Sequence, residues 1–312
     1  MSHRIVAVSG EASLRIDHRN LVIIKDGGVV GRVPMSDLAI LIIEEKTTVI
    51  TQAVLAGCAD FRATVVVCDD RHMPNGVLLS LEGHSLHSKI LRDQIDSSKP
   101  AQKRAWQTIV KAKIMAQADV LNRTERPGAT KLNRLVSLVR SGDPDNVEGR
   151  AAAFYFGALF GPDFYRLRSI ADADAIGESE STLELTNAML NYGYAIIRAC
   201  VSRAIVAAGL HPTLGIHHRN QYNAFCLADD AMEPLRPVVD LRVFQMMKDG
   251  EIDAGAGKLT PAIKRQLVAL TTVDMRFGER TYPLLSALER YSTSLRHAIC
   301  ENEPLAIPTL AN

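Results

Sequence analysis

The chain has 312 residues and a formal net charge of +1 at pH 7, from 36 Lys and Arg against 35 Asp and Glu. Its 47% hydrophobic and 23% charged residues exclude intrinsic disorder, and its longest apolar run, residues 151–161, is too short to span a membrane. Five scattered cysteines exclude a disulfide framework and a zinc ribbon, and the N-terminus has no signal-peptide pattern, so we expect a cytoplasmic protein without a membrane partner.

Residues 1–70 have the pattern of a strand-rich region. Val, Ile and Thr cluster in the runs RIVAVSG, NLVIIKDGGVVGRVP, AILIIEEKTTVI and ATVVVCDD. Asp26-Gly27-Gly28 predicts a tight hairpin, and a short helix is expected over residues 51–59. No long amphipathic helix separates two strands, as a nucleotide-binding parallel sheet would require. We therefore predict a small, mostly antiparallel β domain over residues 1–75 and a linker over residues 76–87.

Helix-forming residues dominate the rest of the chain. Breaks are expected at Arg126-Pro127-Gly128, Ser141-Gly142-Asp143-Pro144 and Gly161-Pro162, and a long apolar helix should end at Gly209. We predict an all-α domain over residues 88–312, so the expected fold class is α+β.

Positive charge is concentrated early in this helical region. Residues 89–140 hold twelve Lys and Arg against four Asp and Glu, an excess of +8, so the remainder carries −7. Lys103, Arg104, Lys111 and Lys113 punctuate helical segments and are expected on an exposed face. Such a face can simply be solvated, but the excess also favours a polyanionic partner, because basic surfaces bind phosphates through counterion release.

The densest group of candidate functional residues lies at residues 215–240, GIHHRNQYNAFCLADDAMEPLRPVVD. Pro234 and Pro237 prevent a regular helix from continuing, so a short helix should end near Glu233. Asp230, three residues before Glu233, would share one helical face with it.

This group has the donor atoms of a metal site. The imidazole of His218 with the carboxylates of Asp230 and Glu233 is a mixed nitrogen and oxygen set, which suits Mn²⁺ or Mg²⁺ better than thiolate-bound zinc. A structural interpretation is also open: His217 and His218 can be surface histidines, and Asp230 can belong to an exposed acidic pair.

Glu148, in DPDNVEGRAAAFYFGALFG, is a further candidate carboxylate. Asp145, three residues earlier, makes the pattern of a capping box, in which Glu148 would only reach back to the backbone of Asp145. The same place near an exposed helix end would also let a metal or a substrate approach. Serine-nucleophile, Walker, dinucleotide-binding and HExxH signatures do not occur in the sequence.

Three ordered motifs, NVEGRAAAFYFGALFG, LNYGYAIIRA and AGLHPTLGIHHRNQYNAFCLADDAMEPLRPVVD, together resemble the Cas-one family of CRISPR-associated adaptation integrases. VVVCDD and MPNG extend the resemblance into the β region, and GIHHRN with LADD and EPLRP is most similar to the versions that accompany Cas-nine (type II) systems. The resemblance implies a β-rich dimerisation domain before a helical catalytic domain. It also implies a metal-dependent DNA endonuclease and integrase that inserts spacer DNA into a CRISPR array.

The resemblance further implies a site and partners. The metal ligands and catalytic residues would be Glu148, His218 and Glu233, with His217 and Asp230 as alternative ligands, and the cation would be Mg²⁺ or Mn²⁺. The 3′-hydroxyl ends of spacer DNA would then attack phosphodiesters of the repeat. The implied partners are double-stranded DNA (spacer precursor and CRISPR repeat), a second copy of the chain in a homodimer, and a small Cas-two dimer.

Two alternatives from other classes are a catalytically silent DNA-binding scaffold of the same complex and a metal-dependent hydrolase of small phosphoesters. In the integrase interpretation, residues 89–140 become a candidate DNA-facing surface. Arg219 and Arg236 become candidate phosphate clamps beside the site.

Overall fold

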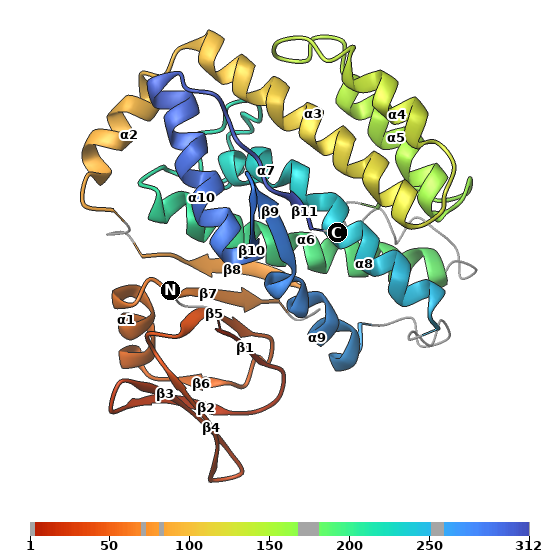
Figure 1. Cartoon of the computed structure of the whole chain (residues 1–312). Helices are drawn as coiled ribbons and strands as arrows, with labels where there is room; N and C mark the ends of the chain where they lie inside the picture. The colour runs from red at the N-terminus through yellow and green to blue at the C-terminus, as the bar shows by residue number, and fades with distance from the viewer. Residues whose placement is uncertain (1–3, 70–72, 81–83, 168–180, 251–258, 312) are drawn as a thin grey trace.

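A computed structural model describes residues 4–69, 73–80, 84–167, 181–250 and 259–311. Two four-stranded sheets occupy the N-terminal region, and most of the remaining described chain is helical (Figure 1). The predicted order, a strand-rich region followed by a helical one, is confirmed.

One sheet has the strand order β4-β3-β2-β6, formed by β2 (Ser13–Asp17), β3 (Asn20–Lys25), β4 (Gly28–Pro34) and β6 (Val49–Ile50). Strands β2, β3 and β4 are antiparallel neighbours. The predicted hairpin is the turn between β3 and β4. Asp26 and Gly27 both have left-handed backbones, with φ of 49° and 76°, which a two-residue type I′ turn requires.

The second sheet has the order β1-β5-β7-β8, formed by β1 (Arg4–Val8), β5 (Leu38–Ile43), β7 (Thr64–Cys68) and β8 (Pro74–Leu78). Here the expectation of mostly antiparallel pairing is corrected, because β1 and β7 both run parallel to β5 and β8 runs antiparallel to β7. The short predicted helix, α1 (Gln52–Asp60), completes the crossover from β5 to β7. All six residues of β5 are buried, which is typical of a central strand covered on both faces.

The helices of the second region follow the predicted breaks. They are α2 (His87–Ile95), α3 (Lys99–Arg123), α4 (Ala129–Val136), α5 (Val147–Phe160), α6 (Ser181–Ala207), α7 (Cys226–Met232), α8 (Arg236–Lys248), α9 (Pro261–Ala269) and α10 (Leu284–Arg296). Shorter turns are η2 (Glu233–Leu235), η4 (Leu270–Thr272) and η5 (His297–Glu301). Within the described ranges, no helix is both long and apolar enough to cross a membrane.

A small third sheet corrects the expectation of an all-α region. Strands β9 (Asp274–Phe277), β10 (Arg280–Pro283) and β11 (Thr309–Leu310) pair antiparallel in the order β10-β9-β11. β9 and β10 are too short to show a clear alternation of apolar and polar residues in the sequence, and β11 joins them from a distant part of the chain. The domain limits at residues 75 and 88 stay a prediction, and strand β8 crosses the first of them.

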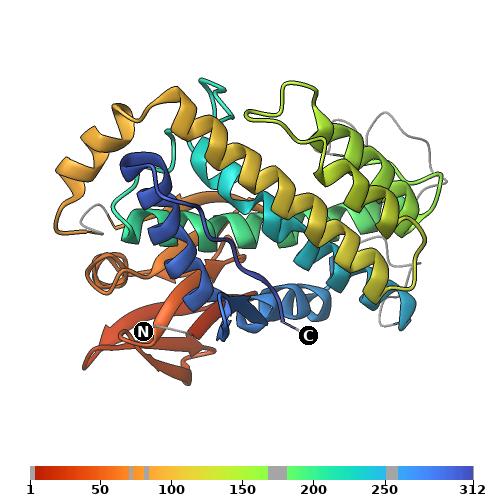
Figure 2. The same ribbon diagram turned by 45° about the horizontal axis from the view of Figure 1, so that its top comes forward.

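The sheet β1-β5-β7-β8 separates two clusters of buried side chains. Along β5, Ile40 and Ile42 belong to the large core of the helical region, whereas Leu41 and Ile43 belong to a smaller core that also contains residues of α1. This alternation follows from the two-residue period of a strand. Helix α6 contacts β7 and β8, and α3 lies across η2 and α8 (Figure 2).

Candidate functional site

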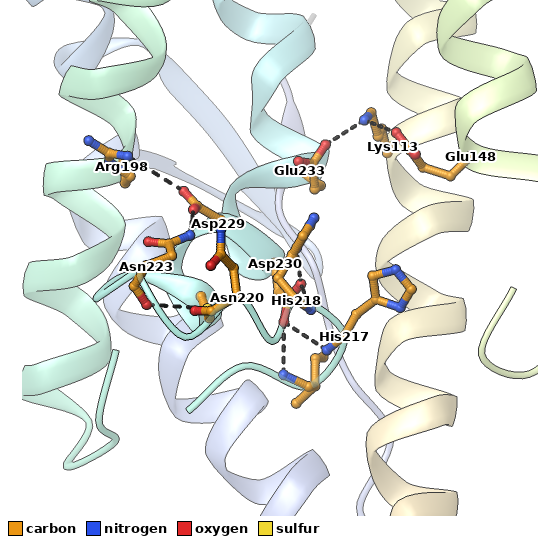
Figure 3. A network of polar contacts seen from close by, with 12 residues as sticks. Lys113, Glu148, Arg198, His217, His218, Asn220, Asn223, Asp229, Asp230 and Glu233 are labelled. Atoms are coloured by element: carbon orange, nitrogen blue, oxygen red, sulfur yellow. Dashed lines mark hydrogen bonds and ion pairs between the residues drawn. The ribbon is translucent and has the colours of Figure 1, made fainter. Parts of the chain in front are cut away.

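A cavity of about 480 Å³ lies where α3, α5, α6 and the α7–η2 segment meet, and it is lined by all three predicted site residues, Glu148, His218 and Glu233. Two further cavities, of about 390 and 420 Å³, contain none of them. Figure 3 shows that the three side chains come from separate segments of the chain. The structure therefore brings together residues that lie up to 85 positions apart in the sequence.

Glu148 lies in the first turn of α5, and the predicted capping box does not form. Asn146 is the N-cap residue, and its side chain accepts a hydrogen bond from a backbone N–H three residues later. The carboxylate of Asp143 accepts from the backbone N–H groups of Val147 and Glu148, each at 3.0 Å. Because these two residues cap the helix, the Glu148 side chain is not needed there and lies at the cavity.

Glu233 begins the single 3₁₀ turn η2, so the prediction that the short helix ends near this residue is confirmed. Its buried carboxylate accepts hydrogen bonds from Lys113 Nζ and from Arg236 Nε, the latter at 2.9 Å. Burial alone would raise the pKa of Glu233, but the Arg236 and Lys113 cations outweigh burial and hold this pKa at about 2. The carboxylate is therefore ionised throughout the physiological range.

Lys113 corrects the expectation of an exposed residue. It is only 7% exposed, and its ammonium donates to the carboxylates of both Glu148 and Glu233 (Figure 3). Burial would lower the pKa of Lys113, but the two carboxylates outweigh burial and raise it. The signal that could have placed this residue is its helical phase, because Trp106, Lys113 and Gln117 share the inward stripe of α3.

Asp230 holds the loop that carries the two histidines. It is fully buried, and its carboxylate accepts from the backbone N–H groups of Ile216, His217 and His218 at 2.8, 2.9 and 3.1 Å. Its Oδ1 also contacts ring Nδ1 of His218 at 2.5 Å. A Cβ on Gly215 would lie 2.2 Å from the carbonyl oxygen of His218, so this tight loop requires glycine. These four contacts assign Asp230 a positioning role.

The adjacent histidines have different surroundings. His218 is held through Nδ1 by Asp230, and this hydrogen bond raises its pKa. The ring of His217 instead stacks on Trp106, with centroids 4.1 Å apart and planes 4° from parallel. Partial burial lowers the pKa of His217. The doubled histidine thus combines one stacking ring with one whose Nε2 is left for a ligand.

The donor set fits a hard divalent cation. Glu148 and Glu233 approach one cationic group from different sides, and oxygen ligands suit Mg²⁺ and Mn²⁺. A histidine whose second ring nitrogen is bound to a buried carboxylate is the usual arrangement of a metal-ligating imidazole. Among the described residues no three His, Cys, Asp or Glu form a ready-made metal cluster, and the ammonium of Lys113 lies between the two glutamates.

The two predicted phosphate clamps differ in position. Arg236 lines the cavity, where its guanidinium lies 4.7 Å from the ring centre of Tyr194. Arg219 is exposed and donates to Gln102 at 3.3 Å, outside the cavity lining. Of these two arginines, Arg236 is therefore the one placed to contact a group inside the cavity.

Comparison with known proteins shows similarity along most of the chain. Residues 5–269 match the family model described as CRISPR associated protein Cas1. Over 302 residues the chain is 36% identical to a "CRISPR-associated endonuclease Cas1" of Neisseria meningitidis serogroup C (strain 8013). That alignment covers 96% of this chain and 93% of the relative.

Solved structures share the fold. A casposase bound to integration product has a TM-score of 0.78 and 20% identity, covering 98% of this chain and 92% of its own. A chain of a Cas6-RT-Cas1–Cas2 complex has a TM-score of 0.73 and 17% identity, covering 97% of this chain and 35% of its own. At these identities the likeness concerns the fold alone.

Proposed function

Because the chain belongs to the Cas1 family, as its motifs indicate, we propose that it is a metal-dependent DNA endonuclease and integrase of CRISPR adaptation. The observation that carries this proposal is the convergence of Glu148, His218 and Glu233 on one cavity. The same convergence argues against a catalytically silent scaffold, which would not need two acidic side chains and an imidazole around one space.

Glu148, His218 and Glu233 are the proposed ligands of Mg²⁺ or Mn²⁺. When bound, such a cation supplies a Lewis acid that polarises a phosphodiester and stabilises the leaving oxygen. Asp230 keeps the His218 ring in one orientation through Nδ1. The depressed pKa of Glu233 keeps its carboxylate available as an anion.

Arg236 is the proposed phosphate-binding group. Its Nε donates to Glu233, which fixes the guanidinium while its other N–H groups can bind a phosphate oxygen. In the proposed reaction a 3′-hydroxyl oxygen of spacer DNA forms a bond to a repeat phosphorus as the phosphorus–oxygen bond to the repeat strand breaks. This transfer needs no covalent protein intermediate.

The proposed partners are double-stranded DNA, a second copy of the chain and a Cas2 dimer, in a type II system. The casposase with integration product and the Cas6-RT-Cas1–Cas2 complex support DNA and Cas2, because proteins of this fold occur in both. Exposed Val29, Val30 and Val67 on the strands support a protein contact on the β region.

A strand-transfer assay tests the proposal. The protein is incubated with its Cas2 partner, a labelled duplex with 3′-hydroxyl ends, a supercoiled plasmid carrying the repeat, and Mn²⁺. We expect covalent joining that disappears in Glu148→Ala, in His218→Ala and with a chelator. Asp145→Ala is the matched control, because Asp145 is an exposed acid near Glu148 that pairs with Arg140.

The outcomes separate the candidate functions. Joining that persists in both Glu148→Ala and His218→Ala would contradict this site. DNA binding without joining by the wild-type protein would favour the scaffold. Turnover of a small phosphodiester without duplex DNA would favour a hydrolase.

A further inference from the structure

Lys113 is a buried cation that lines the cavity. Its ammonium contacts Glu148 and Glu233 (Figure 3). Arg236 contacts the remaining oxygen of Glu233. Burying one charge without a partner is costly. Here two anions and two cations lie together, so each charge has a partner of opposite sign. The pair of glutamates is therefore neutralised by the chain itself.

We propose that Lys113 is a resident counter-ion of the cation site, which neutralises Glu148 and Glu233 before a divalent cation binds and is displaced when it does. The inference rests on the proposed function, because it takes these two carboxylates as metal ligands. An ammonium and a divalent cation compete for the same oxygens and repel each other across a short distance. The ammonium and the divalent cation therefore cannot occupy the space between the glutamates at the same time.

Gln117 offers the displaced ammonium another acceptor. It lies one helical turn beyond Lys113 on α3, and both residues line the cavity. Its Oε1 is buried and has no hydrogen-bond donor among the residues that the structure describes. The flexible four-carbon stem of lysine lets the ammonium change partners while the helix stays in place.

The proposed replacement of the Lys113 ammonium by a divalent cation has two consequences for the protein. Before a cation binds, Lys113 prevents the buried carboxylate of Glu233 and the half-buried carboxylate of Glu148 from facing each other as like charges, so it stabilises the metal-free fold. When a cation binds, two ion pairs must break first, so Lys113 weakens the affinity for metal. Removing the ammonium should therefore change stability and metal affinity in opposite directions, which a purely structural lysine would not do.

Mn²⁺ titration followed by electron paramagnetic resonance tests this without any activity measurement. We expect Lys113→Met to bind Mn²⁺ at least tenfold more tightly than the wild type. In EDTA its melting temperature should fall below that of the wild type, and Mn²⁺ should raise it by more. Lys113→Gln, which keeps a neutral donor, should change in the same directions and serves if Lys113→Met does not fold.

Lys111→Met is the matched control, because it removes one positive charge from the same helix two residues away. It should leave the Mn²⁺ affinity within twofold of the wild type. Equal or weaker Mn²⁺ binding by the folded Lys113 variants would overturn the inference alone. Wild-type binding that is unchanged in Glu148→Gln and Glu233→Gln would overturn the ligand set of the proposed function, and the inference with it.

Discussion

Single carboxylates in this site differ in what they can do, although they lie close together in the sequence. Asp229 and Asp230 are neighbours, yet the first accepts from the side chain of Asn223 at 2.7 Å while the second is fully buried under the histidine loop. Glu233, one turn later, faces two cations instead of backbone N–H groups. The surroundings of each carboxylate therefore give Asp230 a positioning role and leave Glu233 as a proposed ligand.

Asp230→Asn tests the positioning role. The amide would place an N–H₂ group against backbone donors, so we expect the free energy of unfolding to fall by about 3 kcal/mol. The His218 ring would also lose its acceptor, and Mn²⁺ binding should weaken about 10-fold or more. Urea unfolding and Mn²⁺ titration measure the two effects. Asp229→Asn, the same change one position earlier, should lower stability by less than about 1 kcal/mol.

Asp240 makes stability depend on pH. Burial raises its pKa to about 6, although Tyr194 donates a hydrogen bond to its carboxylate. The folded state therefore keeps this proton up to about pH 6, whereas the unfolded chain loses it near the ordinary aspartate pKa of 3.8. The contribution of this group to stability should fall by about 3 kcal/mol as pH rises from about 4 to 6.

Asp240→Asn removes this titration and keeps an oxygen that can accept from Tyr194. We expect its melting temperature to exceed that of the wild type at pH 8, and the difference to shrink below pH 4. Melting curves of both proteins across pH 3 to 8 measure it. Parallel pH profiles for the two proteins would show that Asp240 is not the titrating group.

The candidate site could be foreseen only in part. The resemblance selected Glu148, His218 and Glu233, and the structure places all three at one cavity. Lys113 was missed because its charge predicts exposure, whereas the two carboxylates that stabilise it come from α5 and η2. A partner from a distant segment leaves no signal in the spacing around a residue.

At the level of secondary structure, glycine, proline and helix-end residues marked the boundaries well. Gly209, which ends the long helix, has φ of +86°, a left-handed backbone that favours glycine. Strand partners were harder to foresee. The fully apolar run of β5 fits a central parallel strand, but nothing within the run shows that α1 returns the chain in parallel. Pairing of β11 with β9 likewise depends on tertiary packing.

The start of α5 gives a test at this scale. The Asp143 carboxylate caps two N–H groups, so Asp143→Ala should lower the free energy of unfolding by about 1–2 kcal/mol. Hydrogen exchange should become faster for Val147 and Glu148. Asp145→Ala removes an exposed ion pair with Arg140 instead, and should cost less than about 1 kcal/mol. Equal exchange rates in both variants would contradict the assigned cap.

In the whole molecule, the strand-rich and helical regions share a wall. β5 places side chains in both cores, and at its end the buried Glu44 accepts from Tyr192 of α6. Lys264 of α9 approaches the other oxygen of Glu44 at 3.4 Å. Three distant parts of the chain therefore meet at one polar contact inside an otherwise apolar joint.

Lys264→Met should lower the free energy of unfolding substantially, although it changes only one side chain of this contact. The variant leaves a buried carboxylate without its ammonium, and breaking such a pair typically costs about 3–5 kcal/mol. Replacing both partners, as in Glu44→Gln with Lys264→Met, should cost less than Lys264→Met alone, because no uncompensated charge remains. Lys248→Met, an exposed lysine at the end of α8, is the control and should change stability little. Calorimetry of the four proteins decides the matter: a double variant less stable than Lys264→Met would mean that packing, and not charge pairing, holds the two regions together.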